Sequence, residues 1–377
     1  MIRGNSTVRN IIIDNSCAIN GTNFVGGIAA GCQTNTTNGV TIENCINHAN
    51  VSATGNVAGG IFGQNFSGDI ALIIRNCGNT GNVTVPTNGK AIAGWVGANS
   101  ANVLIENCWN IGDVSSNSPT NNLCNADAEH LAARVIIKNC YDIKAPDGYT
   151  QGTKLSSETV ASGELCAKLG YGFRQNLGED TQPNLDADHG FVTQIGAAGY
   201  STMYNKYSDV TIPVGIEAFA GVINGNHLSL VSITEKIKAS EPVVLKLVEG
   251  TDAGLFNFMP TTGASDIKND LLGSDGNITG AEGNIYALSK QNGKVGFYKV
   301  GTSVTIPEGR VYLEYDSTPG SEVRGFTFDF DDEDDPNGIV SPLGETEERV
   351  AVYNIAGQRL NKMQKGINIV NGKKVLK

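Results

Sequence analysis

Four of the eight cysteines recur at a fixed spacing and offer thiol chemistry. Each follows an asparagine in a segment of one pattern, and the spacings are 32, 31 and 32 residues. The segments are residues 40–45, 72–77, 103–108 and 135–140, which end in Cys45, Cys77, Cys108 and Cys140. In stacked repeats these cysteines would lie within disulfide range. A column of small buried thiols would fill the same space without oxidation, and both alternatives remain open.

Two other residue sets could bind metal ions. An acidic run offers oxygen ligands for calcium, but its spacing departs from an EF-hand loop, and a solvated linker is the alternative. The run contains Asp329, Asp331, Asp332, Asp334 and Asp335. Zinc is less expected, because Cys-x-x-Cys is absent and the histidines are scattered. They are His48, His130, His189 and His227.

Other patterns that carry chemistry are incomplete. Gly-x-Ser-x-Gly, the serine nucleophile turn, is absent from the sequence. Gly170 and Gly172 begin a dinucleotide-binding fingerprint, but Gln175 stands where the third glycine belongs. Carboxylates before residue 150 are few, whereas a polysaccharide lyase or hydrolase gathers several on one face. The sequence therefore assigns no catalytic, cofactor-binding or metal-ligating residue.

The cysteine segments belong to a repeat of about 32 residues. A Gly-rich apolar stretch follows the early copies, as in residues 25–31, 58–63 and 92–97. Each unit therefore predicts three short strands separated by turns. A unit of this size cannot bury its own apolar face, so neighbouring units must stack. We predict a parallel β-solenoid over residues 1–150.

Equivalent residues of successive solenoid coils lie about 4.8 Å apart, so each column of the repeat predicts a ladder. One aliphatic column should stack in the core. It comprises Ile42, Ile74, Ile105 and Ile137. A column of asparagines should link its side-chain amides along the axis at a turn. It comprises Asn44, Asn76, Asn107 and Asn139.

The residues just before these asparagines form a third column. They are Glu43, Arg75, Glu106 and Lys138. Their charges alternate in sign, which suits an exposed column whose vertical neighbours attract each other. A weaker fifth copy of the repeat is predicted at residues 11–17, which end in Cys17.

The rest of the chain departs from this repeat. Residues 151–198 are predicted to cap the solenoid, since exposed sheet edges need covering. A helix is expected within this segment, starting after Ser156 or Ser157 and ending at Gly170. Residues 199–328 contain seven strand-like runs, which favour an antiparallel β-sandwich. The runs are 210–213, 218–223, 228–233, 242–248, 285–289, 295–300 and 310–315. An acidic linker is expected at 329–347, and three strands at 348–377.

Composition and charge exclude several classes of protein. The net charge of −11 and the lack of a basic patch argue against nucleic acid as a partner. No run of 18 apolar residues occurs, so no transmembrane helix is expected. The first residues lack the apolar region of a secretory signal. We therefore expect either an internal protein or a piece of a longer exported chain, and the uncapped start of the repeat favours the second.

Gly-Gly-Ile-Ala stretches that alternate with Ile-x-Asn-Cys-x-Asn units resemble the GLUG-type repeats of bacterial surface and secreted proteins. The resemblance covers residues 8–150. It implies a right-handed parallel β-helix and an extracellular role, and it supplies no catalytic residues. The predicted fold is thus all-β, with a right-handed parallel β-helix, an antiparallel β-sandwich and a small C-terminal β domain.

The tail resembles the C-terminal sorting domain of type IX secretion substrates. The matching residues are 352–360, 366–370 and the basic 373–377. The resemblance implies recognition by the secretion machinery and attachment or release at the cell surface, although this tail is shorter than the long form of the domain.

Together these features predict an exported bacterial protein, extracellular or attached to the outer membrane, with no catalytic role. Its solenoid would present a long regular surface for adhesion, with a surface glycan or a host protein as partner. The alternative is a β-helix polysaccharide lyase or glycoside hydrolase, because such folds often carry these enzymes.

Overall fold

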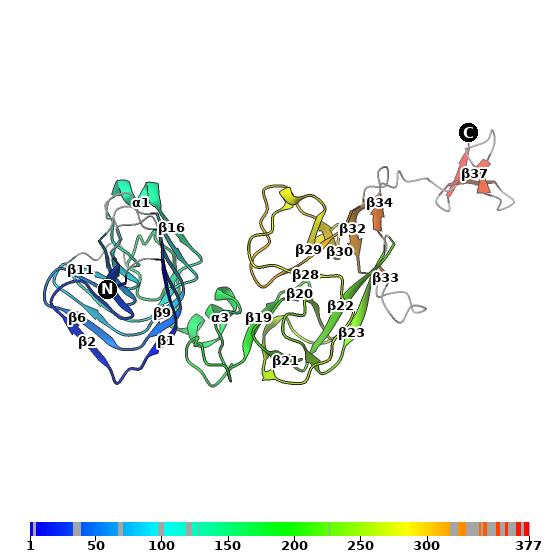
Figure 1. The fold of residues 1–377 in the computed structure, drawn as a ribbon. Helices are drawn as coiled ribbons and strands as arrows, with labels where there is room; N and C mark the ends of the chain where they lie inside the picture. Colours follow the sequence, from blue (N-terminus) through cyan, green and yellow to red (C-terminus); the bar gives the residue numbers. More distant parts are fainter. Residues whose placement is uncertain are drawn as a thin grey trace.

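The computed structural model shows two large β units with short helices between them, and a small separate sheet near the C-terminus (Figure 1). A parallel β-solenoid of about 4 turns comes first, and antiparallel sheets follow. The predicted all-β fold, with a parallel solenoid before antiparallel sheets, is confirmed. The described residues are 1–2, 5–32, 39–66, 71–96, 102–117, 123–126, 128–225, 227–316 and 323–328, with short strands between 339 and 376.

Four parallel sheets run along the solenoid. The first contains β1 (Ser6–Ile13), β5 (Val40–Asn47), β9 (Leu72–Asn79), β13 (Val103–Glu106), β14 (Trp109–Asn110), β16 (Val135–Lys138), β17 (Tyr141–Asp142) and β18 (Thr153–Lys154). The second contains β2 (Ala18–Gly21), β6 (Asn50–Ala53), β10 (Val83–Thr84) and β15 (Val114–Ser115). The other two contain β3 (Val25–Gly26), β7 (Val57–Gly59) and β11 (Asn88–Lys90), and β4 (Ala29–Cys32), β8 (Phe62–Asn65) and β12 (Ala93–Trp95).

The coils contain four strand segments rather than the predicted three, because the Gly-rich stretch divides into two. In one coil the division falls at Gly60, between β7 and β8, where backbones of neighbouring coils approach closely. A Cβ atom at Gly60 would lie 2.2 Å from the carbonyl oxygen of Ala91, so the bend requires glycine. Ile61 and Phe62 follow the bend and are fully buried in the solenoid core.

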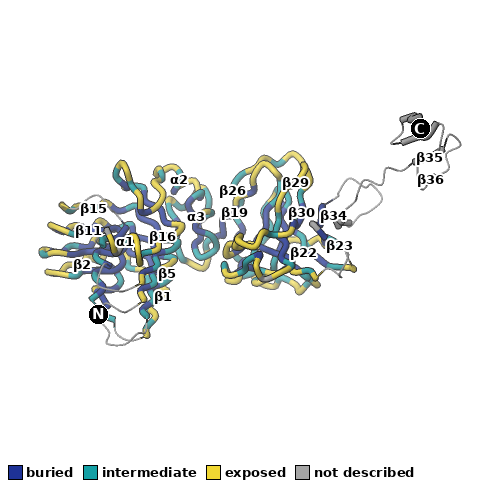
Figure 2. Tube along the Cα trace, turned by 90° about the horizontal axis from the view of Figure 1, so that it is seen from above, coloured by how far each residue is buried: buried dark blue, intermediate teal, exposed yellow. Residues whose placement is uncertain are grey.

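The aliphatic column forms the predicted core ladder. Ile42 pairs in register with Ile74, which pairs with Ile105, and Ile105 pairs with Ile137. The first three are fully buried, and Ile137 packs at the margin of the same cluster. Figure 2 shows buried residues along the coils of the solenoid.

The charged column also lies in register, and the structure extends it by one residue. Arg9 pairs with Glu43, so the sign alternates from the first strand of the solenoid onwards. Arg75 forms an ion pair with Glu43, with 2.6 Å between nitrogen and oxygen. Glu106 lies between Arg75 and Lys138 in the strand register. The predicted pairing of vertical neighbours is thus present at Glu43 and Arg75.

The predicted asparagine ladder is confirmed. The side-chain Nδ2 of Asn76 donates to Oδ1 of Asn44 at 3.1 Å, and Asn107 and Asn139 continue the chain at 3.1 and 2.5 Å. All four residues have a left-handed backbone, with φ between 47° and 52°. Asparagine tolerates this conformation better than most residues, so the column bends each coil and links it to the next.

A second asparagine ladder, not predicted from the sequence, lies three residues further along each coil. It comprises Asn47, Asn79, Asn110 and Asp142, joined by side-chain hydrogen bonds of 3.0, 2.9 and 2.9 Å. All four side chains are buried. In the sequence this ladder corresponds to the second asparagine of the Asn-Cys-x-Asn unit, which recurs at the coil length.

The predicted fifth copy of the repeat at residues 11–17 is wrong in register. Strand β1 places Ile11 opposite Cys45, and Asn10 stands next to Asn44 with a ladder hydrogen bond of 3.4 Å. Val8 and Ile11 are the residues of β1 that pack against the core. This packing fixes the register, and Cys17 lies beyond the strand, exposed.

The segment after the last coil contains two short helices instead of the single predicted helix. They are α2 (Ser157–Ala161) and α3 (Glu164–Leu169). Ser156 is the N-cap of α2, and its side chain accepts a hydrogen bond from the Thr159 amide. Gly163 separates the helices because its backbone is left-handed, with φ of 89°. A further helix, α1 (Ala128–Arg134), precedes β16 within the last coil.

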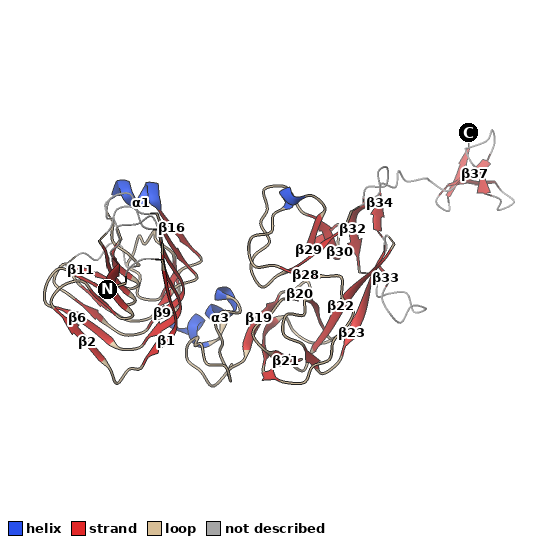
Figure 3. Ribbon diagram, viewed as in Figure 1, coloured by secondary structure: helices blue, strands red, loops and turns tan. Residues whose placement is uncertain are grey.

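Helices α2 and α3 lie against the flank of the solenoid, between it and the antiparallel sheets (Figure 3). Their apolar side chains share a cluster with Ile46, Trp109 and Tyr141, which come from different coils. Strand β18 adds to the edge of the first solenoid sheet, next to β17. The predicted capping segment therefore extends one sheet edge and covers one side of the solenoid.

The antiparallel unit begins with β19 (Phe191–Ile195), which pairs with β26 (Gly254–Phe258), so it starts before the predicted boundary at residue 199. One sheet contains β20 (Tyr200–Met203), β25 (Val243–Leu247), β22 (Ile216–Asn224), β23 (His227–Ile233) and β33 (Ile339–Val340). A second contains β28 (Leu272–Gly273), β31 (Val311–Glu314), β29 (Ile285–Gln291), β30 (Lys294–Lys299), β32 (Val323–Thr327) and β34 (Pro342–Gly344). Smaller elements are β24 (Lys236–Ile237), β21 (Asp209–Thr211), β27 (Pro260–Thr261) and the 3-10 helix η1 (Gly280–Glu282).

The two large sheets share a core, as expected for a sandwich, and each predicted strand run overlaps an observed strand. Val244 of β25 packs in this core with Phe297 and Phe326. Its neighbours Val243 and Leu245 face the opposite side, where they pack with residues of β19 and β21. The central sheet is therefore buried on both faces, which a two-layer sandwich does not require.

The predicted linker at 329–347 contains two strands, β33 and β34, which pair with β23 and β32. The acidic run with Asp329 and Asp335 lies outside the described residues. The last strands form an antiparallel sheet of four where the sequence predicts three. They are β35 (Val352–Asn354), β36 (Arg359–Leu360), β37 (Ile367–Val370) and β38 (Lys373–Leu376).

Candidate ligand groove beside the solenoid

A groove lies where the solenoid, the helical segment and the antiparallel unit meet. Its volume is about 380 Å³, within the usual range for a small-molecule site. The lining residues come from three regions far apart in the sequence. They are Asn10, Ile12, Asn44, Tyr171, Gly172, Arg174, Leu185 and Tyr207.

The solenoid wall of the groove contains one end of the first asparagine ladder. This ladder is called the exposed ladder, because its members are exposed or half-buried whereas those of the second ladder are buried. Asn10 lies in β1 with a left-handed backbone, and its Oδ1 accepts the hydrogen bond from Asn44. Its Nδ2 has no hydrogen-bond partner among the described residues. Ile12, on the same strand, is 43% exposed and gives this wall an apolar surface. The wall therefore combines an amide donor with an aliphatic side chain.

Arg174 lies on the opposite wall, packed beside two aromatic rings. Its guanidinium carbon lies 4.6 Å from the centre of the Phe191 ring and 5.8 Å from that of Tyr207. One guanidinium nitrogen donates to the main-chain carbonyl of Asp186 at 3.2 Å. The residue is 9% exposed, and burial lowers the pKa of the guanidinium from its ordinary value. Stacking and one hydrogen bond fix the group while other N–H donors remain.

Two tyrosines complete the groove. The hydroxyl of Tyr171 is 2.9 Å from that of Thr193, and its ring meets Phe191 edge to face, with 5.9 Å between centres. Tyr207 stacks on Phe191 at 6.0 Å and is 43% exposed. The Tyr171 ring is thus held in place, while Tyr207 offers accessible surface to a ligand.

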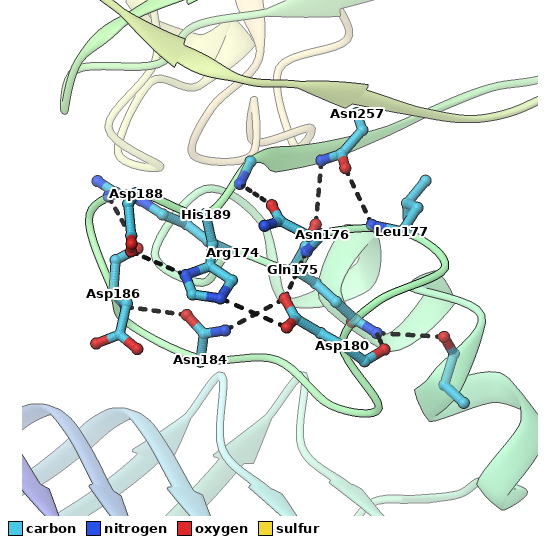
Figure 4. Close-up of polar contacts among 12 residues, drawn as sticks. Arg174, Gln175, Asn176, Leu177, Asp180, Asn184, Asp186, Asp188, His189 and Asn257 are labelled. Carbon is cyan, nitrogen blue, oxygen red and sulfur yellow. Dashed lines mark hydrogen bonds and ion pairs between the residues drawn. The ribbon is translucent and has the colours of Figure 1, made fainter.

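A network of polar contacts fixes the loop that carries Arg174 (Figure 4). A carboxylate oxygen of Asp180 accepts the backbone N–H of Asn176 at 2.6 Å, and its other oxygen lies 3.4 Å from His189. Asn257 of β26 accepts the Leu177 N–H and donates to the Gln175 carbonyl, both at 3.0 Å. The loop is therefore tied to the antiparallel unit, which orients Arg174.

A second hollow, of about 530 Å³, lies at the C-terminal end of the solenoid. It is lined by Leu131, Val135, Ile137 and residues of the last turn, including Gln151. Gln151 exchanges two hydrogen bonds with the backbone of Cys124. The side-chain amide of Gln151 therefore stabilises the local backbone. The lining of this hollow contains no arginine or lysine, whereas the groove contains Arg174 packed on an aromatic ring.

The residues that the sequence singled out for chemistry do not meet in this groove. The cysteines of the repeat column line the solenoid core as free thiols. His48 is 2.8 Å from the Thr80 hydroxyl, and His189 contacts Asp180 and Asp188. Within the described part of the chain, no three His, Cys, Asp or Glu side chains are grouped to hold a metal. The possible calcium ligands lie outside that part.

The groove residues themselves were missed, apart from the asparagine column and Gly172, which the sequence offered only as part of an incomplete dinucleotide-binding pattern. Asn10 carried a weak signal, because it follows the charged Arg9 as Asn44 follows Glu43. Arg174 and Tyr207 carry no repeat signal. Their meeting with Asn10 depends on how the helical segment packs on the solenoid flank.

Comparison of the chain with protein-family models, curated proteins and solved structures finds no match in any of the three. The class of the protein therefore rests on its fold, a β-solenoid with a lateral groove and an antiparallel β unit. Among the described residues, no helix is long and apolar enough to span a membrane.

The thiols allow a test of the open question about disulfides. Seven of the eight cysteines are buried, Cys17 is exposed, and all are free in this structure. Burial also raises the pKa of the Cys77, Cys108 and Cys140 thiols well above the ordinary value, so they stay protonated and unreactive. At pH 8, Ellman's reagent should modify one thiol in the folded chain and eight after unfolding without reductant. Fewer than eight after unfolding would show that disulfides form.

Proposed function

We propose that this protein binds carbohydrate in the groove beside its solenoid and works as an adhesin-like protein on the surface of a bacterium. The observation that carries the proposal is the groove itself, where tyrosine rings lie beside amide and guanidinium donors. Carbohydrates need this combination, because a sugar ring has apolar faces for stacking and hydroxyls for hydrogen bonds.

The lining of the groove supports binding rather than hydrolysis. Its eight residues include donors, rings and aliphatic side chains, and none of the eight is a carboxylic acid. Glycoside hydrolysis commonly uses a pair of carboxyl groups across the scissile bond. A non-enzymatic role thus agrees better with this groove than the polysaccharide-degrading alternative does.

Location at the cell surface is part of the proposal. It rests on the resemblance of residues 8–150 to GLUG-type repeats and of the tail to type IX sorting domains. In this proposal the tail engages the secretion machinery, and the solenoid presents the groove outside the cell to a surface glycan or a glycosylated host protein.

Substitution of Tyr207 by alanine tests the groove. Loss of the exposed ring should weaken binding to a glycan found on a carbohydrate array about fivefold or more, since stacking on an aromatic ring contributes on the order of 1 kcal/mol or more. Tyr207→Phe keeps the ring and should bind within a few-fold of the parent. Titration calorimetry measures both, and circular dichroism confirms folding.

Three results would count against the proposal. Binding by Tyr207→Ala at the parent affinity would place the site elsewhere, and no binding to any array glycan would contradict carbohydrate binding. Release of reducing ends or unsaturated uronates from the same glycans would instead support the enzyme alternative.

A further inference from the structure

We infer that the groove selects a sugar unit that carries a carboxylate, such as a uronic or sialic acid. The inference rests on the proposed carbohydrate binding and names the class of ligand. It depends on two donors, the guanidinium of Arg174 and the side-chain amide of Asn10, which come from different walls of the groove.

Arg174 supplies a buried positive charge without a carboxylate partner. The residue as a whole is 9% exposed, and no carboxylate of the described residues forms an ion pair with it. Asp186 and Asp188 act on it only electrostatically, from further away. A buried charge is costly unless it is paired. An anionic ligand would provide that pair, and the fork of guanidinium N–H groups matches a carboxylate.

The acidic neighbours of Arg174 are directed elsewhere. Asp186 offers it a main-chain carbonyl, and Asp188 lies 3.0 Å from a ring nitrogen of His189. Figure 4 shows both contacts. Both carboxylates are exposed to solvent, which screens their charge.

Asn10 supplies a neutral donor with a defined orientation. Each later asparagine of the exposed ladder donates its Nδ2 to the asparagine of the preceding coil. The Oδ1 of Asn10 accepts from Asn44, and its Nδ2 has no hydrogen-bond partner among the described residues, so in this structure Asn10 presents a donor at the groove. An oxygen acceptor on the ligand is the natural complement.

Two cations near the groove, Arg75 and Lys206, already have carboxylate partners. Arg75, which acts electrostatically on Tyr207, forms its 2.6 Å ion pair with Glu43. Lys206 contacts Asp275 at 2.6 Å and Glu308 at 3.2 Å. Arg174 is therefore the residue of the groove lining whose positive charge is available to an anionic ligand.

The experiment compares matched probes and matched variants of the whole chain. The probes are oligosaccharides that contain glucuronic, galacturonic or sialic acid, each beside its carboxyl-reduced form. The test variant is Asn10→Asp, which keeps the oxygen that accepts from Asn44 but replaces the amide donor with a negative charge. Asn20→Asp is the control, because Asn20 is an exposed residue of β2 outside the groove and the change in net charge is the same.

We expect the parent chain to bind at least one carboxylated probe ten times or more tightly than its reduced form. Asn10→Asp should lose at least tenfold in affinity for that probe and little for the neutral form, and Asn20→Asp should match the parent. Equal affinity for both forms, or no effect of Asn10→Asp, would overturn the inference. In either case, loss of glycan binding in Tyr207→Ala would leave the proposed carbohydrate binding in place. If the parent chain bound none of the probes and no array glycan, both the proposed function and this inference would be overturned.

Discussion

Replacement of Trp109 by alanine is expected to lower the free energy of unfolding by about 3–5 kcal/mol. Trp109 is fully buried where the helical segment meets the solenoid flank. Its ring lies over Gly78 of the preceding coil, where a Cβ atom would be 2.4 Å from the indole, and it meets Phe173 edge to face at 6.2 Å. Alanine would leave a cavity between these elements that their packing cannot easily close.

Urea unfolding followed by circular dichroism measures this effect, and Trp95, the other tryptophan, remains as a fluorescent probe. Trp109→Phe is the matched control. Among the described residues the buried indole N–H has no hydrogen-bond partner, so phenylalanine loses no hydrogen bond, and its cost should be clearly smaller. Equal unfolding curves for Trp109→Ala and the parent would contradict the assigned packing of the helices on the flank.

Replacement of Asn79 by alanine should cost about 3 kcal/mol, because Asn79 is the centre of the buried ladder. Its amide donates to the Gly81 carbonyl at 2.8 Å and to Asn110 at 2.9 Å, and its oxygen accepts from Asn47 at 3.0 Å. Alanine would leave several of these polar groups buried with unfilled hydrogen-bonding capacity. Such groups are expensive in a solenoid core that excludes water.

The exposed ladder supplies the control for this prediction. Asn76→Gly also removes two ladder hydrogen bonds, to Asn44 and from Asn107. Water can replace them at this half-buried position, and glycine accepts the left-handed backbone with φ of 51°. The loss should stay within about 1 kcal/mol. If Asn76→Gly destabilised the chain as much as Asn79→Ala, burial would not be the source of the difference.

Much of the solenoid could be predicted, because its order follows from a periodic sequence. Ile42, Ile74 and Ile105 recur at the coil length, so stacking places them in one ladder by the strand register alone. The asparagine that bends each coil is equally visible, since few other residues accept its backbone conformation. The register of β1 was not predicted, because the two possible alignments of its short apolar run differ only in which residues face the core.

The sequence by itself therefore determined the repeat, its core columns and seven of the strands of the antiparallel unit. Tertiary structure alone decided that the helical segment lies on the solenoid flank, that the central antiparallel sheet is covered on both faces, and that Asn10, Arg174 and Tyr207 share a groove. The physical reason is that periodicity records contacts between neighbouring coils. Contacts between segments far apart in the chain depend on the complementary shapes of surfaces that exist only after each segment has folded.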